Sequence, residues 1–394
     1  MSGVPSNATL TVVDFKPTLT DDELAKLKRR LADAKETFPR ATYASNQAKY
    51  GAQHDWVKNT LSYWHDSYDW RKYEHHLHSV NHYKADVEQG GSTYSIHFIA
   101  HFSSDPNAIP LCLNHGWPGS AIEFLRAVKF LSESKSPAFH VIAPNQPGYL
   151  WSSPPPIDKG FGMHDCAEIL HKLMLGLGFT RGYAVQGGDI GSVLSRIMAC
   201  KYKECLAVNV NYLPLTPPAG VENPDQGLTQ LEIRNYKKAN EFLTTGRAYA
   251  SLQGTRPGTA GLIMQSSPVA LLSWLGEKFR DWTDETPPID EILSIVTAWF
   301  ILETYPTSIW AYSELPTGVG GWSRNPDYFI QKPMGFSSFE HEISSAPQSW
   351  AAQTGNLQFY KYHSRGGHFA AMERPQEFAQ DMNECFAKIW PGFL

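Results

Sequence analysis

Asp189 stands at the centre of the segment Gly187-Gly188-Asp189-Ile190-Gly191-Ser192, whose residue types and spacing could support nucleophilic chemistry. The apolar run Tyr183 to Val185 precedes the segment, and a helix is expected from Val193 to Cys200. A strand, a glycine turn and a helix form the context of the nucleophile elbow, which usually carries serine. Glycines two residues before and after Asp189 allow the tight turn because they lack a Cβ. Taken alone, the segment could equally be a glycine-rich loop whose aspartate caps a helix.

A second motif, His115-Gly116-Trp117-Pro118-Gly119-Ser120, follows the apolar run Pro110 to Leu113. In hydrolases with a nucleophile elbow, this loop supplies one backbone N–H of the oxyanion hole, and the residue after the nucleophile supplies the other. We therefore expect Trp117 and Ile190 to be the donors. The Trp117–Pro118 bond is a candidate cis peptide. The other residues expected to shape the loop are His115, Gly116 and Pro118.

A general base is expected after the last strand, because the usual chain order is nucleophile, acid and histidine. His368 has this position, in the block that runs from Gly366 to Pro375. Its flanking glycines distinguish it from His341 and His363, which lack that setting.

The acid that orients the histidine should follow a late strand and precede His368. Glu340 and Glu342 both follow the apolar run 333–339, and Asp327 is a third option. Position alone does not separate Glu340 from Glu342.

A carboxylate at the elbow predicts a different reaction from that of serine. Serine attacks acyl carbonyls, whereas a carboxylate displaces a leaving group at saturated carbon and becomes an alkyl ester. Water activated by His368 would then attack the ester, and the oxyanion hole would hold the tetrahedral intermediate. The substrate must therefore carry an epoxide oxygen or a halide.

The leaving group separates these two substrate classes. An epoxide oxygen leaves as an alkoxide and needs a proton donor, a role suited to tyrosines in an overlying cap. Residues 214–320 contain four tyrosines, which are Tyr236, Tyr249, Tyr305 and Tyr312. A halide needs only N–H donors, and dehalogenases usually place tryptophan where Ile190 stands here. The pattern favours an epoxide. The alternatives are a haloalkane dehalogenase and a hydrolase-fold binding protein that has lost catalysis.

Alternating apolar runs and helical stretches predict the elements that position these residues, and they indicate a mostly parallel sheet of the α/β class. The expected strands are 94–102, 110–113, 141–143, 183–185, 206–210, 333–339 and 357–362. The expected helices include 20–40, 121–131, 164–177 and 375–390. The first two strands, joined directly, are candidates for an antiparallel arrangement.

Four segments are expected along the chain. Residues 1–92, rich in aromatic side chains from 53 to 85, should wrap the core. Residues 93–213 and 321–394 should form the two parts of the α/β core. Residues 214–320 should form a helical cap that begins at a proline-rich linker ending at Pro218. The cap tryptophans fit either an apolar pocket or the cap core, and they are Trp282, Trp299 and Trp310.

Composition excludes several classes of protein. The net charge of -5 without a basic stripe argues against nucleic-acid binding. Five widely spaced cysteines without a CxxC argue against a disulfide framework or a zinc site. Residues 1–7 lack a signal-peptide pattern, and no window of about 18 apolar residues occurs. We therefore expect a cytoplasmic protein without a membrane anchor.

Taken together, these residues resemble the microsomal-type epoxide hydrolases, particularly the soluble fungal members, along nearly the whole chain. Besides the loop and the elbow, the matching segments are Tyr68 to Arg71, His82 to Lys84 and Gly366 to Pro375. The resemblance implies an α/β-hydrolase fold with a helical cap and an N-terminal wrapping segment. It also implies an Asp189 ester, an epoxide and water as reactants, no cofactor or metal, and a homodimer.

The resemblance also implies roles that position left open. The charge-relay acid of the family matches Glu342, within Phe339-Glu340-His341-Glu342-Ile343. The two cap tyrosines of the family match Tyr249 and Tyr312, so that Tyr236 and Tyr305 are expected to be structural. The chain departs from the mammalian members at its N-terminus, where their transmembrane anchor has no counterpart.

Overall fold

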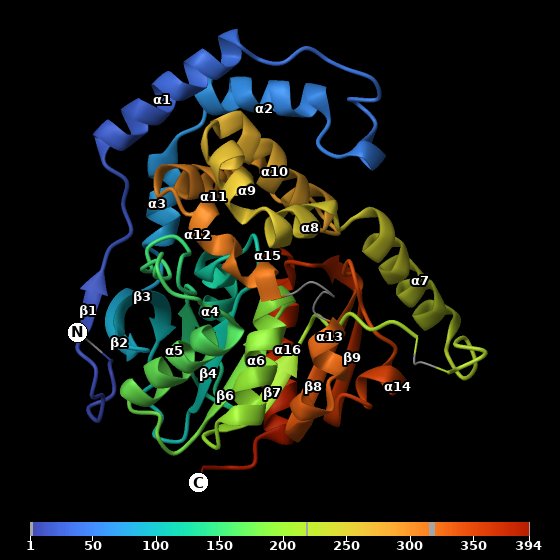
Figure 1. The fold of residues 1–394 in the computed structure, drawn as a ribbon. Helices are drawn as coiled ribbons and strands as arrows, with labels where there is room; N and C mark the ends of the chain where they lie inside the picture. Colours follow the sequence, from blue (N-terminus) through green and yellow to red (C-terminus); the bar gives the residue numbers. More distant parts are fainter. Residues whose placement is uncertain (1–2, 218–219, 315–319, 394) are drawn as a thin grey trace.

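The computed structural model describes residues 3–217, 220–314 and 320–393. Parts of the sequence predictions lie outside these ranges, namely Met1, Ser2, Pro218, Ala219, residues 315–319 of the expected cap, and Leu394. Within the described ranges, a central sheet carries helices on both faces, and a helical cap lies above one edge of the sheet (Figure 1).

A mixed sheet forms the centre of the molecule. Its strands are β1 (Val12–Phe15), β2 (His82–Gln89), β3 (Ser92–His101), β4 (Ile109–Asn114), β5 (Phe139–Pro144), β6 (Tyr183–Gly187), β7 (Cys205–Val210), β8 (Ile330–His341) and β9 (Gly355–Gly367). In the described part of the chain, the order of these nine strands is β1-β2-β3-β5-β4-β6-β7-β8-β9. The six strands from β4 to β9 are parallel, whereas β1, β2 and β3 pair antiparallel. The predicted α/β class with a mostly parallel sheet is confirmed.

Two strands of the N-terminal region were not predicted. β1 has only four residues, and the aromatic density around β2 hid its alternation of buried and exposed side chains. Both strands extend the sheet on the β3 side, where Tyr83 pairs with Phe98. The strands expected at 94–102 and 110–113 correspond to β3 and β4. They run antiparallel but are not neighbours, because β5 lies between them.

Helices cover both faces of the sheet. They are η2 (Ala121–Phe124), α4 (Leu125–Ser132), α5 (Met163–Gly176), α6 (Asp189–Lys201), α14 (Gln348–Ala351), α15 (Ala370–Glu373) and α16 (Pro375–Ile389). α5 packs against α6 on one face, and α4 packs against α16 on the other (Figure 1). α6 is fastened by the buried Arg196, which donates to the carbonyl oxygens of Tyr328 and Thr354 at 3.0 and 2.8 Å.

The cap is inserted between β7 and β8. Its helices are α7 (Gln230–Thr245), α8 (Ala248–Thr255), α9 (Pro257–Gln265), α10 (Pro268–Asp281), α11 (Ile289–Ile301), α12 (Tyr305–Ser308) and η3 (Ile309–Glu314). α13 (Gly320–Arg324) and η4 (Pro326–Tyr328) lead back into the sheet. Start signals in the sequence fit these bounds, since Thr229 and Glu232 form a capping box and Pro257 and Pro268 begin helices. The predicted helical character of this region is confirmed for its described residues.

No single described helix is long and apolar enough to cross a bilayer. The bent pair made of Ile289–Ile301 and Tyr305–Glu314 meets the criteria of length and composition only when its two parts are combined, across a bend of 94°.

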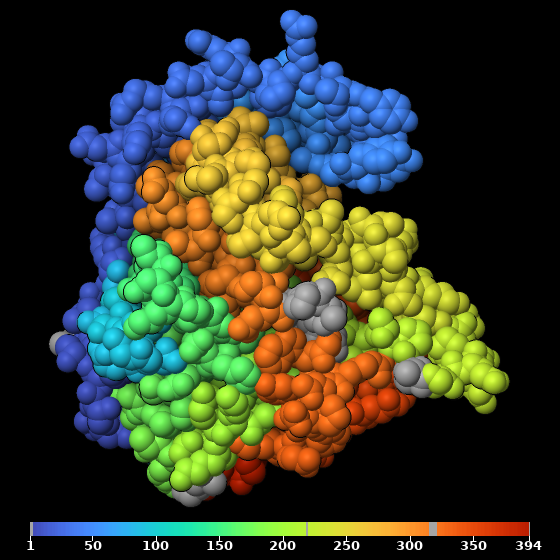
Figure 2. Space-filling model, in the orientation of Figure 1, coloured from blue at the N-terminus to red at the C-terminus, as the bar shows by residue number. Residues whose placement is uncertain are grey.

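The N-terminal segment also lies over the cap. Its helices are α1 (Asp21–Glu36), η1 (Ala48–Tyr50), α2 (His54–Asp66) and α3 (Trp70–Leu77). Figures 1 and 2 show α1 and α2 on the outer side of the cap, away from the sheet. The buried Trp64 on α2 donates its indole N–H to Thr297 of α11 at 3.0 Å. The segment therefore joins the sheet through β1 and β2 and holds the cap through its helices.

The carboxyl ends of the parallel strands converge beneath the cap. Asn114 at the end of β4 pairs with Gly187 at the end of β6. His341 at the end of β8 pairs with Gly367 at the end of β9. In open α/β sheets, sites form at this edge because the loops that follow the strands meet there. The loop residues 115–118 follow β4, Asp189 follows β6, Glu342 follows β8 and His368 follows β9.

Candidate active site

Asp189 occupies the sharp turn between β6 and α6. Its φ of +48° lies in the left-handed region, which costs free energy for a residue with a side chain. Gly187 and Gly191 flank the turn, where an added Cβ would overlap backbone atoms of Gly191 and Asn114, respectively. The expected elbow is therefore present. Asp189 itself carries the backbone strain, and the two glycines permit the close approach of neighbouring chain.

The loop after β4 presents a backbone donor to Asp189. The N–H of Trp117 donates to Asp189 Oδ1 at 2.9 Å, and the Trp117–Pro118 bond is cis. Gly116 leaves room for the nucleophile, since a Cβ there would overlap the Asp189 side chain. Among the described residues, no hydrogen bond joins the Ile190 N–H to Asp189. As the second residue of α6, Ile190 has an N–H without an intrahelical partner, and its donor role stays a prediction.

His115 stabilises the loop from inside. Its Nε2 accepts from the N–H of Gln146 at 3.0 Å, so the neutral ring carries its proton on Nδ1 and donates to the Gly116 carbonyl at 2.9 Å. Burial lowers the pKa of His115 to about 4, which keeps the ring neutral. The ring therefore holds the loop whose next N–H reaches Asp189.

His368 lies between two carboxylates. Its Nε2 is 3.3 Å from Asp189 Oδ2, and its Nδ1 is 2.6 Å from Glu342 Oε1. Glu342 Oε1 also accepts from the N–H of Ile343 at 2.7 Å, and the residue is 2% exposed. The arrangement holds an imidazole in one orientation, with the Nε2 side toward Asp189.

The other acids and histidines considered from the sequence lie elsewhere. Glu340 pairs with Arg234 at the surface, and Asp327 is exposed on η4. His341 is paired with Asp284 and His363 with Asp381. The structure therefore brings only Glu342, of the three acids considered, into contact with His368.

The charge of His368 follows from its two neighbours. Burial alone would lower the pKa of His368, but the charges of Glu342 and Asp189 and their hydrogen bonds raise it to about 10. In the resting site the ring is therefore an imidazolium beside the Asp189 carboxylate. The imidazole and the Asp189 carboxyl group are thus in direct contact.

Two of the four cap tyrosines lie over the loop after β4. The Trp117 ring stacks with Tyr249 at a centroid distance of 5.3 Å and meets Tyr312 edge-on at 5.6 Å. Tyr236 bonds instead to Asp225, and the hydroxyl of Tyr305 donates to Gln253 at 3.1 Å. Tyr249 comes from α8 and Tyr312 from η3, so the cap fold brings together residues 63 positions apart.

Both of these phenols are neutral. Burial, followed by the charge of Asp189, raises the pKa of Tyr249 above its usual value. Burial, followed by Tyr249 and Asp189, raises the pKa of Tyr312 well above its usual value. Each hydroxyl therefore keeps its proton at neutral pH.

Aromatic residues that the sequence did not assign enclose His368. Trp282 meets the imidazole edge-on at 5.0 Å, and Tyr212 does so at 5.3 Å. The carbonyl of Trp282 also accepts from the N–H of His368 at 2.9 Å. Trp282 is thus at the site, whereas Trp310 bonds to the Pro147 carbonyl within the packing between cap and core. These contacts join distant segments, so no local motif marks them.

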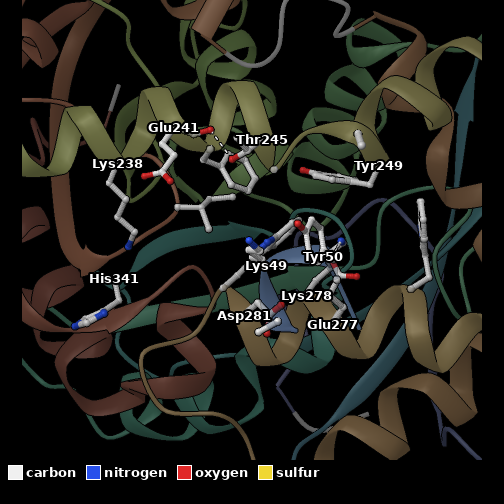
Figure 3. A pocket seen from close by; sticks show the side chains of 18 residues that line it. Lys49, Tyr50, Lys238, Glu241, Thr245, Tyr249, Glu277, Lys278, Asp281 and His341 are labelled. Carbon is white, nitrogen blue, oxygen red and sulfur yellow. Dashed lines mark hydrogen bonds and ion pairs between the residues drawn. The ribbon is translucent and has the colours of Figure 1, made fainter. Parts of the chain in front are cut away.

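A larger cavity of about 560 Å³ has Tyr249 in its wall (Figure 3). It is lined mainly by residues of η1, α7, α8 and α10, by His341 at the end of β8 and by Ile343. The buried Lys278 ammonium in this wall lies 5.0 Å from the Tyr249 ring centroid. Tyr249 therefore borders this cavity and also stacks on Trp117.

No group of three His, Cys, Asp or Glu residues in the described chain is arranged to hold a metal ion. The five cysteines are free thiols, four of them buried.

The sheet, the elbow and the inserted cap define the class of the protein as an α/β hydrolase with aspartate at the nucleophile position. Residues 12–124 match the family model described as "Epoxide hydrolase N terminus", and residues 109–228 match "alpha/beta hydrolase fold". A putative epoxide hydrolase of Dothistroma septosporum is 36% identical, over 97% of this chain and 91% of that protein. Epoxide hydrolase 1 of Sus scrofa is 32% identical, over 94% and 87%.

Solved structures agree with the sequence relatives. Aspergillus niger epoxide hydrolase superposes with a TM-score of 0.91 at 36% identity, covering 98% of this chain and 99% of that chain. Juvenile hormone epoxide hydrolase from the silkworm Bombyx mori superposes with a TM-score of 0.83 at 26% identity, covering 96% and 95%. The chain therefore belongs to the epoxide hydrolase family, whose members are hydrolases that act on epoxides.

Proposed function

We propose that this enzyme converts epoxides to vicinal diols through a covalent ester on Asp189. The observation that carries the proposal is the placement of one carboxylate, strained at the elbow, between the Trp117 N–H and His368 Nε2. Glu342 on the far side of the imidazole supports its role as the base.

In the first half-reaction, Asp189 Oδ2 attacks an epoxide carbon, and the C–O bond of the ring breaks. The developing alkoxide takes a proton from Tyr249 or Tyr312, whose pKa values are raised by burial and which are therefore protonated. The products are an ester at Asp189 and a neutral hydroxyl on the adjacent carbon. Asp189 Oδ1 becomes the ester carbonyl oxygen, already within reach of the Trp117 N–H.

In the second half-reaction, water loses a proton to His368 Nε2 and its oxygen bonds to Asp189 Cγ. The tetrahedral oxyanion is stabilised by the Trp117 N–H, and by the Ile190 N–H if it completes the hole. The ester C–O bond then breaks, and the departing alkoxide takes the proton from His368. The second proton of the water remains on the Asp189 carboxyl until it passes to the tyrosinate left by the first half-reaction, which regenerates both the Asp189 carboxylate and the neutral phenol. Glu342 stabilises the imidazolium formed between these steps.

The two cap tyrosines support an epoxide over a halide. A halide leaves as an anion that needs N–H donors and no proton, whereas the site presents two phenols. Ile190 is buried next to Asp189 and its side chain has no donor. The homodimer implied by the family resemblance stays a prediction.

Single-turnover reaction with styrene oxide in ¹⁸O-labelled water tests the proposal. We expect an unlabelled first diol and one ¹⁸O atom in the Asp189 peptide by mass spectrometry, because the carboxylate supplies the product oxygen. Asp189→Ala should form neither ester nor diol. Asp327→Ala, which removes an exposed carboxylate, should behave as the wild type. A labelled diol with unlabelled Asp189 would show direct attack by water and contradict the covalent route.

A further inference from the structure

A second, much smaller cavity lies directly against the proposed nucleophile and base. Its volume is about 10 Å³, and its lining includes Glu123, Gln186, Asp189 and His368. A buried water needs about 10–15 Å³ of such space and two to four polar partners. The cavity therefore has room for one water, next to both groups that would use it in ester hydrolysis.

Glu123 contributes an oxygen that lacks a protein partner. It lies on η2, three residues after Ser120 and the loop that presents the Trp117 N–H. Its Oε2 is shielded from solvent and accepts no hydrogen bond from any residue that the structure describes. The loop is shaped around this carboxyl, because a Cβ at Gly119 would overlap Glu123 Oε2. A shielded oxygen without a partner is unfavourable, so its placement at a water-sized cavity indicates a water.

Gln186 supplies an independent second observation. It lies on β6, three residues before Asp189, and its amide N–H donates to Asn211 Oδ1 at 2.6 Å. Its Oε1 is also buried without a partner among the described residues. Two residues from different elements, each with an unsatisfied side-chain oxygen, thus line the same small cavity.

The protonation state of Glu123 suits a partner for neutral water. Burial raises the pKa of Glu123 to about 8, with His368 opposing this shift and Asp189 adding to it. At neutral pH the carboxyl is therefore mainly protonated and can donate its O–H to a water. That water can then donate one hydrogen to His368 Nε2 and one to Gln186 Oε1. A lone pair remains for attack on Asp189 Cγ.

We propose that Glu123 is a positioning residue that holds the hydrolytic water between Gln186 and His368 for attack on the Asp189 ester. The inference rests on the proposed function, because it concerns the second half of that reaction. The atom balance is that of ester hydrolysis, with the water proton passing to His368 and the water oxygen to Asp189. Glu123 gains and loses no atom in the net step.

The test separates the two half-reactions of the full chain. After rapid mixing with styrene oxide and acid quench, intact-protein mass spectrometry follows the alkyl-enzyme as it forms and decays. Glu123→Leu should leave formation within about twofold and slow decay by about 10²-fold, since a misplaced reactant costs this much. The ester should accumulate, and kcat and KM should fall together because formation governs kcat/KM.

Matched variants separate positioning from packing. Glu123→Gln keeps both a donor and an acceptor and should restore decay to within about fivefold of wild type, on the same positional reasoning. Glu133→Leu, which removes an exposed carboxylate beyond α4, should match the wild type. If Glu123→Leu does not fold, Glu123→Asp tests the role of Glu123 instead. Its side chain is one methylene shorter, so the carboxyl is drawn back from the cavity and ester decay should slow at least about tenfold.

One possible outcome would contradict the role of Glu123, and another would contradict the covalent mechanism itself. Wild-type ester decay in folded Glu123→Leu, or in Glu123→Asp, would overturn the role of Glu123 and leave the covalent mechanism intact. Absence of an Asp189 ester in both the wild type and the Glu123 variants, while diol still forms, would overturn the covalent mechanism and this inference with it.

Discussion

Two opposite charges meet in a site closed to bulk water, where the Asp189 carboxylate lies 3.3 Å from the imidazole of His368. The arrangement has a kinetic consequence, because ester formation removes the charge of Asp189. His368 then loses one of the two neighbours that raise its pKa to about 10. The pKa of the imidazole should therefore fall once the ester has formed. His368 should therefore hold its proton before the ester forms and lose it more readily afterwards, when the ring has to act as the base.

Ester hydrolysis should depend on pH through His368. The reaction needs the neutral ring, so the hydrolysis rate should rise with pH until it passes the pKa of His368 in the ester. Glu342 raises that pKa. Glu342→Gln should therefore shift the rise to lower pH, and loss of the imidazolium stabiliser should lower the plateau by about 10²–10⁴-fold. Quenched single-turnover experiments over a range of pH measure both the shift of the rise and the height of the plateau. Glu340→Gln is the matched control, and an unshifted profile in Glu342→Gln would reject Glu342 as the acid.

Epoxide opening should depend on the two phenols above Asp189. Tyr249→Phe and Tyr312→Phe should each slow ester formation at least about tenfold, and the double variant by about 10²–10⁴-fold, the usual range for general acids. Each single variant should lose less than the double variant, because the other phenol can still donate a proton. Rapid-quench mass spectrometry gives the rate of formation. Tyr305→Phe, whose hydroxyl bonds to Gln253, should react as the wild type, and an equal loss there would indicate damage to the cap instead.

The elements around the elbow hold a residue with strained backbone. Asp189 has a positive φ, and α6, which begins at Asp189, is held at two points. At its start, Gly191 packs against the backbone of Asn114. Further along, the guanidinium of Arg196 reaches the carbonyls that precede β8 and β9. A strained residue persists only where surrounding structure holds it in place.

Removal of the Arg196 anchor should destabilise the fold. Arg196→Met leaves the partly buried Tyr328 carbonyl and the Thr354 hydroxyl without their donor, and the Thr354 carbonyl keeps only the Ile330 N–H. Each group that loses its donor costs about 1–3 kcal/mol. We expect the free energy of unfolding to fall by about 3 kcal/mol, measured by urea denaturation. Lys201→Met at the exposed end of α6 should change it by less than about 0.5 kcal/mol. Equal stability of the two variants would show that α6 does not depend on this anchor.

Across the whole molecule, the N-terminal segment links the cap to the sheet. Its strands complete one side of the sheet, and α1 and α2 lie over α10 and α11 (Figure 1). The cap carries Tyr249 and Tyr312, and the sheet carries Asp189 and His368. The relative position of the proton donors and the nucleophile therefore depends on how firmly this segment packs.

Trp64 at the centre of this packing should be essential for stability. Trp64→Ala removes a side chain that is 2% exposed and leaves a large cavity, which costs about 3–5 kcal/mol. Denaturant unfolding followed by circular dichroism should show this loss, and the rate of ester formation should also decrease. Tyr43→Ala, at a residue 91% exposed in the same segment, is the control. Normal stability of Trp64→Ala would contradict a holding role for the segment.

Local sequence determined much of the chemistry. Asp189, Trp117 and His368 each follow a strand end in a glycine-rich context, and a parallel sheet brings such ends to one edge. Strand and helix periodicity likewise predicted the α/β core and the helical cap. The short β1 and the aromatic-rich β2 were not predicted, because their pairing, β1 with β2 and β2 with β3, defines them more than their own residue pattern does. The expected boundaries of the four segments stay predictions.

Only the tertiary structure shows which acid contacts His368, which tyrosines pack on Trp117 and which buried carboxyl lines the small cavity beside Asp189. Glu340 and Glu342 are two residues apart, yet the end of β8 sends one toward Arg234 and the other toward His368. Tyr249 and Tyr312 meet on Trp117 because the cap folds back on itself. Glu123 has no motif of its own, and only its cavity connects it to Asp189. Sequence spacing marks residues that share a strand end, whereas contacts between distant segments depend on how those segments pack.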